Sequence, residues 1–134
     1  MIGTGAMSDP YMHCEEDLRL TGACLEIIRK YGFGAAVQTK SDRILRDIDL
    51  LDEINRNAKS VVQMTLTTYD DDLCGILEPN VCSTKRRIEV LEEMRKRMAR
   101  ERTEEYFGDM KALGYDRAEA AEMAQREREN GNGD

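Results

Sequence analysis

Polar side chains alternate with apolar ones along two short segments, AAVQTK at residues 35–40 and VVQMTLT at residues 61–67. Such alternation is typical of strands that present one face to an apolar core and the other to something polar. The ammonium, hydroxyl and amide groups on this second face could hold a charged small molecule through charge-assisted hydrogen bonds. The positions that share the polar face are Gln38, Lys40, Gln63, Thr65 and Thr67.

The helices and strands that must position these residues can be inferred from periodicity. A weak, glycine-rich strand is predicted at residues 2–8 and better strands at 35–40 and 61–67, and a helical pattern follows each of them. The strands recur about every 27 to 30 residues, the length of a strand, a helix and a right-handed crossover. The spacing therefore predicts parallel strands in a βαβαβα order.

The polar strand face distinguishes two architectures. Helices cover both faces of an open doubly wound sheet, so both should be apolar, whereas the inner face of a barrel meets other strands or a ligand. The sequence therefore predicts an α/β fold: an incomplete parallel (βα) barrel of about three units over residues 1–94, with the polar side chains in its lumen. A sheet face that meets solvent is the alternative. Residues 95–130 are predicted to form a charged helical extension, and residues 131–134 a disordered tail.

Polar residues also gather where the predicted strands end. Ser8 and Asp9 follow the first strand, Lys40 ends the second, and Thr65 lies near the end of the third. Parallel barrels and open α/β sheets place their binding sites at this carboxyl end of the strands. These residues are therefore candidates for a binding site. No Ser–His–Asp arrangement accompanies them, so catalytic residues are left unassigned.

The four cysteines are too scattered to form a metal knuckle, which needs two thiolates about three residues apart. Cys24 and Cys74 fall on apolar helical positions and are predicted to be small core residues. No metal ligand is assigned from the sequence. The other two cysteines are Cys14 and Cys82.

Charge and hydropathy constrain the partners. The net charge of −7 disfavours nonspecific binding to nucleic acid. No apolar run approaches the roughly 20 residues of a membrane span, and the first residues lack the pattern of a signal peptide. A cytoplasmic protein without a membrane partner is expected.

Three strings fit together in order and spacing: GTGAMSDPYMHCEEDLRLT, GFGAAVQTKSDRILRDIDLL and VVQMTLTTYDDDLCGILEPNVCSTKRRIEVLEEM. Together they resemble the radical S-adenosylmethionine (SAM) enzymes of the spore photoproduct lyase-like group over residues 1–94. The resemblance implies a partial (βα) barrel, a [4Fe–4S] cluster held by a CxxxCxxC loop, and SAM chelating the open iron. Reductive cleavage of SAM would then give a 5′-deoxyadenosyl radical that abstracts hydrogen from a substrate.

The resemblance also implies cofactor-binding roles by position. Ser8 and Asp9 match residues beside the methionine moiety of SAM, and Lys40 matches a lysine suited to its carboxylate. Thr65 matches a hydroxyl residue able to reach the ribose or the carboxylate. The remaining candidates, neighbours in the expected lumen, are Gln38 and Gln63.

The cluster loop of that family is missing from this sequence. CxxxCxxC is absent, and Ala6 stands where spore photoproduct lyase has its hydrogen-donating cysteine. We therefore expect a truncated fragment of an enzyme that in full-length form would cleave SAM, and we expect this chain alone to be inactive. Open barrel edges should also make it self-associate.

Two functions of other classes stay open. One is a non-catalytic α/β scaffold whose charged helices after Met94 bind a partner. The other is an open-sheet nucleotide-binding module, for which GTGAMS is only a loose glycine loop. No substrate is assigned on any of these hypotheses.

Overall fold

The computed structural model describes residues 1–131, and most of them are helical. The chain divides into two compact units, Met1–Arg95 and Lys96–Asp134. Among residues 1–131, no helix is both long and apolar enough to cross a bilayer.

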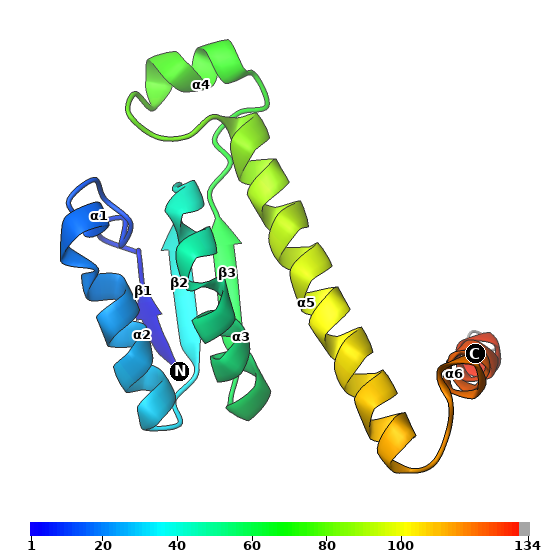
Figure 1. Ribbon diagram of the computed structural model, residues 1–134. Coiled ribbons are helices and arrows are strands. Elements are labelled where there is room, and N and C mark those ends of the chain that lie inside the picture. Colours follow the sequence, from blue (N-terminus) through cyan, green and yellow to red (C-terminus); the bar gives the residue numbers. More distant parts are fainter. Residues whose placement is uncertain (132–134) are drawn as a thin grey trace. The chain divides into compact units, whose positions relative to one another are not determined.

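The first unit contains one small sheet of three strands, β1 (Ile2–Thr4), β2 (Ala35–Thr39) and β3 (Ser60–Met64), in the order β1-β2-β3 (Figure 1). Both pairings are parallel, with Ile2 opposite Ala35 and Ala35 opposite Ser60, so the predicted parallel order is confirmed. The predicted incomplete barrel is wrong, because the sheet is open and the chain is mostly helical. Three short strands leave two open edges and cannot enclose a lumen.

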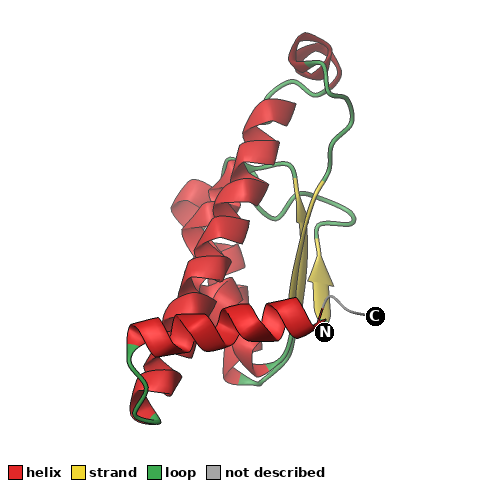
Figure 2. Ribbon diagram, turned by 90° about the vertical axis from the view of Figure 1, so that its right-hand side faces the viewer, coloured by secondary structure: helices red, strands yellow, loops and turns green. Residues whose placement is uncertain are grey.

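Within this unit, helices pack against only one face of the sheet. Figure 2 shows the strands as a thin layer with helices of the first unit stacked on one face, while α4 (Asp71–Leu77) lies beyond the carboxyl ends of the strands (Figure 1). The other face carries no helix of the unit. The helices of the chain are α1 (Glu15–Leu18), α2 (Leu20–Lys30), η1 (Asp42–Asp47, a 3-10 helix), α3 (Ile48–Asn57), α4 (Asp71–Leu77), α5 (Thr84–Ala112) and α6 (Arg117–Gly131).

The core of the first unit lies between the sheet and these helices. Ala35 and Val37 of β2 point into it, and their alternation with more exposed neighbours follows from the pleat of the strand. Cys74 is buried as predicted, but the prediction for Cys24 is wrong because its side chain is exposed. The helical and loop residues of the core are Tyr11, Leu25, Ile28, Ile44, Ile48, Leu51, Ile54, Val90 and Met94.

The opposite face of the sheet carries two glutamines that meet solvent, beside the partly exposed Ala36 and Val61. Gln38 and Gln63 are directly paired in the register, and both are exposed. The Gln38 amide donates a hydrogen bond to the Thr65 hydroxyl at 3.3 Å. The expected lumen is therefore absent from this face, and the alternative of a solvated sheet face describes it.

The second unit consists of the C-terminal part of α5 and of α6. Asp116 caps α6, because its carboxylate accepts hydrogen bonds from the backbone N–H groups of Ala118 and Glu119 at 2.8 and 2.9 Å. Within the described part of the second unit, the buried residues are Met110 of α5 and Ala120 of α6. The predicted disordered tail covers residues 131–134. Residue 131 is the last residue of α6, and residues 132–134 lie outside the described part of the chain.

Candidate functional site at the carboxyl edge of the sheet

Asp9 joins the end of β1 to the end of β2. Its carboxylate accepts hydrogen bonds from the Thr39 hydroxyl at 2.7 Å, from the Lys40 backbone N–H at 2.7 Å and from the Tyr11 backbone N–H at 2.9 Å. Both oxygens are therefore occupied by groups of the chain itself. An aspartate with these partners fixes the loops at the carboxyl edge, whatever else it does.

Lys40 and Glu78 form the centre of this edge. The Lys40 ammonium lies 2.5 Å from one oxygen of the Glu78 carboxylate, and the Thr67 hydroxyl donates to the same oxygen at 2.6 Å. The Arg87 guanidinium lies 2.8 Å from the other oxygen. Hydrogen bonds from Lys40 and Thr67, and then from Arg87, lower the pKa of Glu78 to about 2, against the opposing effect of burial.

Arg87 is completely buried and connects three segments of the chain. It donates to the backbone oxygens of Thr65 at 2.8 Å and Cys82 at 2.9 Å, in addition to the ion pair with Glu78. One planar guanidinium thus orders the loop after β3 and the loop before α5. Thr65 supplies a carbonyl to this network, while its hydroxyl faces Gln38 on the solvated side.

The structure brings some of the predicted site residues together and leaves others apart. Asp9 and Lys40 meet at the carboxyl edge, and Thr65 follows β3 at the same edge. Ser8 is exposed in the preceding loop, and the two glutamines lie on the solvated sheet face. No observation on this structure assigns them a ligand, so their roles remain predictions.

Sequence reasoning missed Glu78 and Arg87 as members of the edge. A signal for Arg87 was present: it stands three residues before Val90 and seven before Met94, both core residues. A cation in line with an apolar helical stripe indicates a buried ion pair, because a lone buried charge is prohibitively unfavourable. Glu78 carries no comparable local signal, since it lies in a turn.

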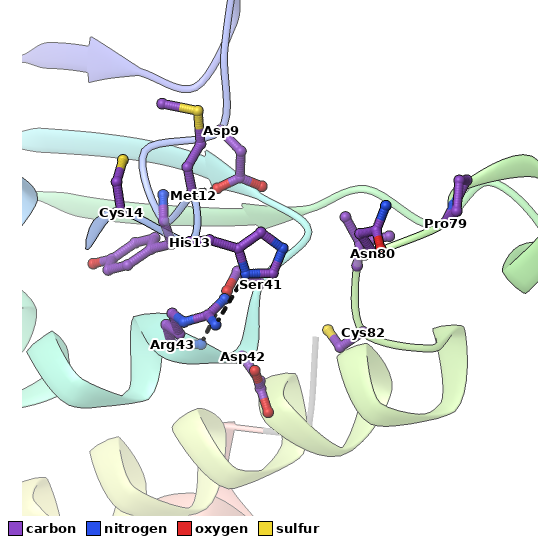
Figure 3. Close-up of a pocket in the computed structure, with 12 residues that line it drawn as sticks. Asp9, Met12, His13, Cys14, Ser41, Asp42, Arg43, Pro79, Asn80 and Cys82 are labelled. Carbon is purple, nitrogen blue, oxygen red and sulfur yellow. Dashed lines mark hydrogen bonds between the residues drawn. The ribbon is translucent and has the colours of Figure 1, made fainter. Parts of the chain in front are cut away.

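A pocket of about 430 Å³ adjoins this edge, lined by residues that include Asp9, His13, Arg43 and Cys82 (Figure 3). Arg43 is already engaged, because it donates to the Glu16 carboxylate at 2.8 Å and lies 3.4 Å from the His13 ring.

Burial, and then Asp42, raise the pKa of the Cys82 thiol, whose sulfur lies 2.9 Å from the Lys40 carbonyl oxygen. The pocket therefore presents compensated charges and a protonated thiol.

The cysteines do not fit a [4Fe–4S] cluster. Three thiolates must converge on one cube, but Cys14 and Cys82 lie at opposite ends of the pocket in Figure 3, and Cys24 is on the exposed side of α2. Among residues 1–131, no group of three or more His, Cys, Asp or Glu side chains is placed to hold a metal ion.

The polar groups of the edge also satisfy one another. In the described part of the chain, every buried side-chain nitrogen and oxygen has a hydrogen-bond partner. The site therefore contains no orphaned buried group aimed at a missing ligand. A carboxylate ligand would have to replace Glu78 at Lys40.

A comparison with curated proteins finds a similar protein whose own function is uncharacterized. The chain is 32% identical over 93 residues to the uncharacterized protein MJ0683 of Methanocaldococcus jannaschii. The matched segment is 69% of this chain and 34% of the relative, so the chain spans about a third of that protein's length. No family model matches the sequence, and no solved structure matches it.

Proposed function

We propose that this chain is a cytoplasmic fragment of a radical SAM protein of the spore photoproduct lyase-like group, contributing strand ends that contact SAM but no cluster ligand. The observation that carries the proposal is the contact of Lys40 with a carboxylate at the carboxyl edge of three parallel strands. Glu78 stands in for the carboxylate of a ligand there. The family assignment in this proposal rests on the resemblance of the three sequence strings, and Lys40 lies in the second of them.

The proposed role of the chain is binding rather than catalysis. The Lys40 side chain is 36% exposed, so its ammonium can leave Glu78 and reach a ligand carboxylate without unfolding the edge. Arg87 and Thr67 would then continue to balance the Glu78 charge. Asp9 would hold the two strand ends in place through its existing hydrogen bonds.

Equilibrium dialysis with labelled SAM tests this binding. The wild-type chain should retain SAM, and Lys40→Met should weaken its affinity about 10-fold or more, the value of one charge-assisted hydrogen bond. The matched control is Lys59→Met, because Lys59 is exposed just before β3, at the opposite end of the strands. Absence of binding by the wild-type chain, or equal loss in both variants, would refute the proposal.

Anaerobic reconstitution with iron and sulfide tests the second half of the proposal. The isolated chain should not assemble a stoichiometric four-iron centre, since its thiols do not converge. Iron counting and an ultraviolet-visible spectrum provide the measurement. Four irons per chain with the matching absorption would overturn the assignment of this chain as a cluster-free part.

A non-catalytic α/β scaffold that binds another polypeptide is the second candidate. It is favoured by a specific observation: apolar side chains of α2 are exposed in a row, whereas the polar edge is internally paired. A chain whose polar groups are satisfied and whose apolar surface is not is suited to protein contacts. This candidate predicts a stable complex and no affinity for SAM.

A further inference from the structure

One surface of the first unit is apolar and has no partner within that unit. Leu20 and Ile27 of α2 are each 58% exposed, Tyr31 at the end of α2 is 67% exposed, and Cys24 is also exposed. Their spacing of four, three and four residues places them on one stripe of the helix. We name this stripe, together with the free edge of β1, the β1–α2 face.

The stripe faces away from the neighbouring helix. Gly22 lies against Asp47, and Arg29 pairs with Glu53 of α3 at 3.0 Å, so these two positions mark the side of α2 that meets η1 and α3. On a helix of 3.6 residues per turn, the stripe lies roughly opposite that side. In Figure 1, α2 accordingly has α3 on one flank and no element of the unit on the other.

The same surface continues onto the sheet. Leu20 and Cys24 line a pocket of about 440 Å³ together with Ile2 and Gly3 of β1. Ile2 is itself 45% exposed at the edge of the sheet. Apolar side chains of α2 and backbone of β1 thus border one continuous hollow.

Gly3 offers the free hydrogen-bonding groups of β1. The Ile2 backbone N–H donates to the Gly34 carbonyl at 2.7 Å, so Ile2 directs its backbone groups toward β2. Because these groups alternate along a strand, the N–H and C=O of Gly3 point to the open edge. A residue that presents both a donor and an acceptor is complementary to an identical residue in an antiparallel strand.

We propose that the β1–α2 face is the contact of a symmetric dimer between two copies of this chain. The twofold axis passes beside Gly3, so that the two Gly3 residues exchange N–H···O bonds and extend the sheet across both copies. The two α2 stripes then pack against each other in antiparallel orientation. None of the stripe positions carries a charge, so two chains of net charge −7 meet there without like charges at the centre of the contact.

This arrangement resolves two unfavourable features at once. An open strand edge and an exposed apolar stripe each favour association with another chain, and a single isologous contact covers both. The proposal specifies the surface of the predicted self-association and does not depend on SAM binding, since Lys40 lies at the carboxyl edge outside the β1–α2 face.

Light scattering coupled to size-exclusion chromatography measures the outcome across a wide range of protein concentration. The wild-type chain should have twice its monomer mass of 15.3 kDa, and Ile27→Lys should have the monomer mass. Gly3→Pro should also shift the equilibrium to monomer, because it removes the outward N–H. The control is Ile76→Lys, at a 76% exposed isoleucine of α4 outside the face, which should remain dimeric.

Circular dichroism establishes that the variants are folded, and Leu20→Lys gives a second substitution on the stripe. A wild-type chain that is monomeric at every concentration overturns the proposal. So does a dimer that survives both Ile27→Lys and Leu20→Lys, or one lost equally in Ile76→Lys. Retained SAM binding by a monomeric Ile27→Lys variant would separate this proposal from the cofactor proposal.

Discussion

The carboxyl edge of the sheet and the β1–α2 face differ in how their groups are satisfied. At the edge, Lys40, Glu78 and Arg87 compensate one another, and Arg87 is completely buried. On the face, Leu20 and Ile27 of α2 are each more than half exposed. The charged groups of the edge are paired with one another, whereas the apolar side chains of the face stay exposed unless another surface covers them.

This difference indicates how substitutions in the two regions should act. Removing one group from a closed network leaves its buried partners uncompensated, which lowers the stability of the folded state. Changing an exposed apolar residue leaves the folded unit nearly unaffected and alters what the surface binds. Stability and association should therefore separate cleanly between the edge and the face.

The largest expected effect comes from Glu78→Ala. The substitution leaves the Arg87 guanidinium buried without its carboxylate, which should lower the free energy of unfolding by about 3–5 kcal/mol. Urea denaturation followed by circular dichroism gives the value. Ile27→Lys is the comparison variant, and it should change the stability of the monomer by no more than about 0.5 kcal/mol.

Equal losses in the two variants would remove the distinction between edge and face. A nearly neutral Glu78→Ala would show that water reaches Arg87 and that the edge is open. Monomer stability has to be compared at a concentration at which neither protein dimerises, since association adds to the apparent stability.

A smaller but still clear effect is expected at Gly5, where the chain leaves β1 beside β2. Gly5 has φ of +101°, and a Cβ atom there would lie 1.9 Å from the Gln38 carbonyl oxygen. Gly5→Ala should therefore cost at least about 1–3 kcal/mol in stability, the range for a strained backbone conformation. The control is Gly75→Ala in α4. A Cβ atom there would have no atom within 4 Å other than those of its chain neighbours and of the helix's own backbone.

The control should act in the opposite direction. Alanine is favoured over glycine inside a helix by about 0.5–1 kcal/mol, so Gly75→Ala should be neutral or stabilising. Thermal melts of both variants give the comparison. A Gly5→Ala protein as stable as the wild type would mean that the end of β1 can move away from β2 and that the edge is less closed than its contacts indicate.

Local periodicity was sufficient to predict the order and parallel pairing of the strands. Apolar alternation in AAVQTK and β-branched residues in SVVQM mark β2 and β3, and turn residues mark their ends. The closure of the sheet could not be predicted in this way, because it depends on how many strands pair and not on the sequence of any one of them. The polar face was correctly recognised, but its environment was not.

The edge shows the same division between local and long-range information. Asp9 and Lys40 were found because they follow strands, and parallel strands place their ends together. Glu78 was missed, since a turn residue 38 positions after Lys40 reaches it only through the loops ordered by Arg87. Cys24 was misplaced because it was assigned to the core from an apolar helical position alone, whereas its side chain is exposed beside Leu20 and Ile27 on α2.

A dependence of stability on pH is also expected at the closed edge. The pKa of Glu78 is lowered to about 2 in the folded chain, from an ordinary value of 4.5. Its contribution to stability is therefore fully present above about pH 4.5 and is lost as the pH falls toward 2. The stability difference between the wild type and Glu78→Gln should be constant near neutral pH and should shrink through this window.

Urea midpoints at several pH values between neutrality and the acid limit of folding give this difference directly. Gln63→Ala, at an exposed residue of the first unit that carries no titrating group, is the control and should show no such trend. A difference that grows as the pH falls would mean that Glu78 is protonated more easily in the folded chain than in the unfolded one. Lys40 and Arg87 would then not be holding its charge, and the edge would be as unsatisfied as the β1–α2 face.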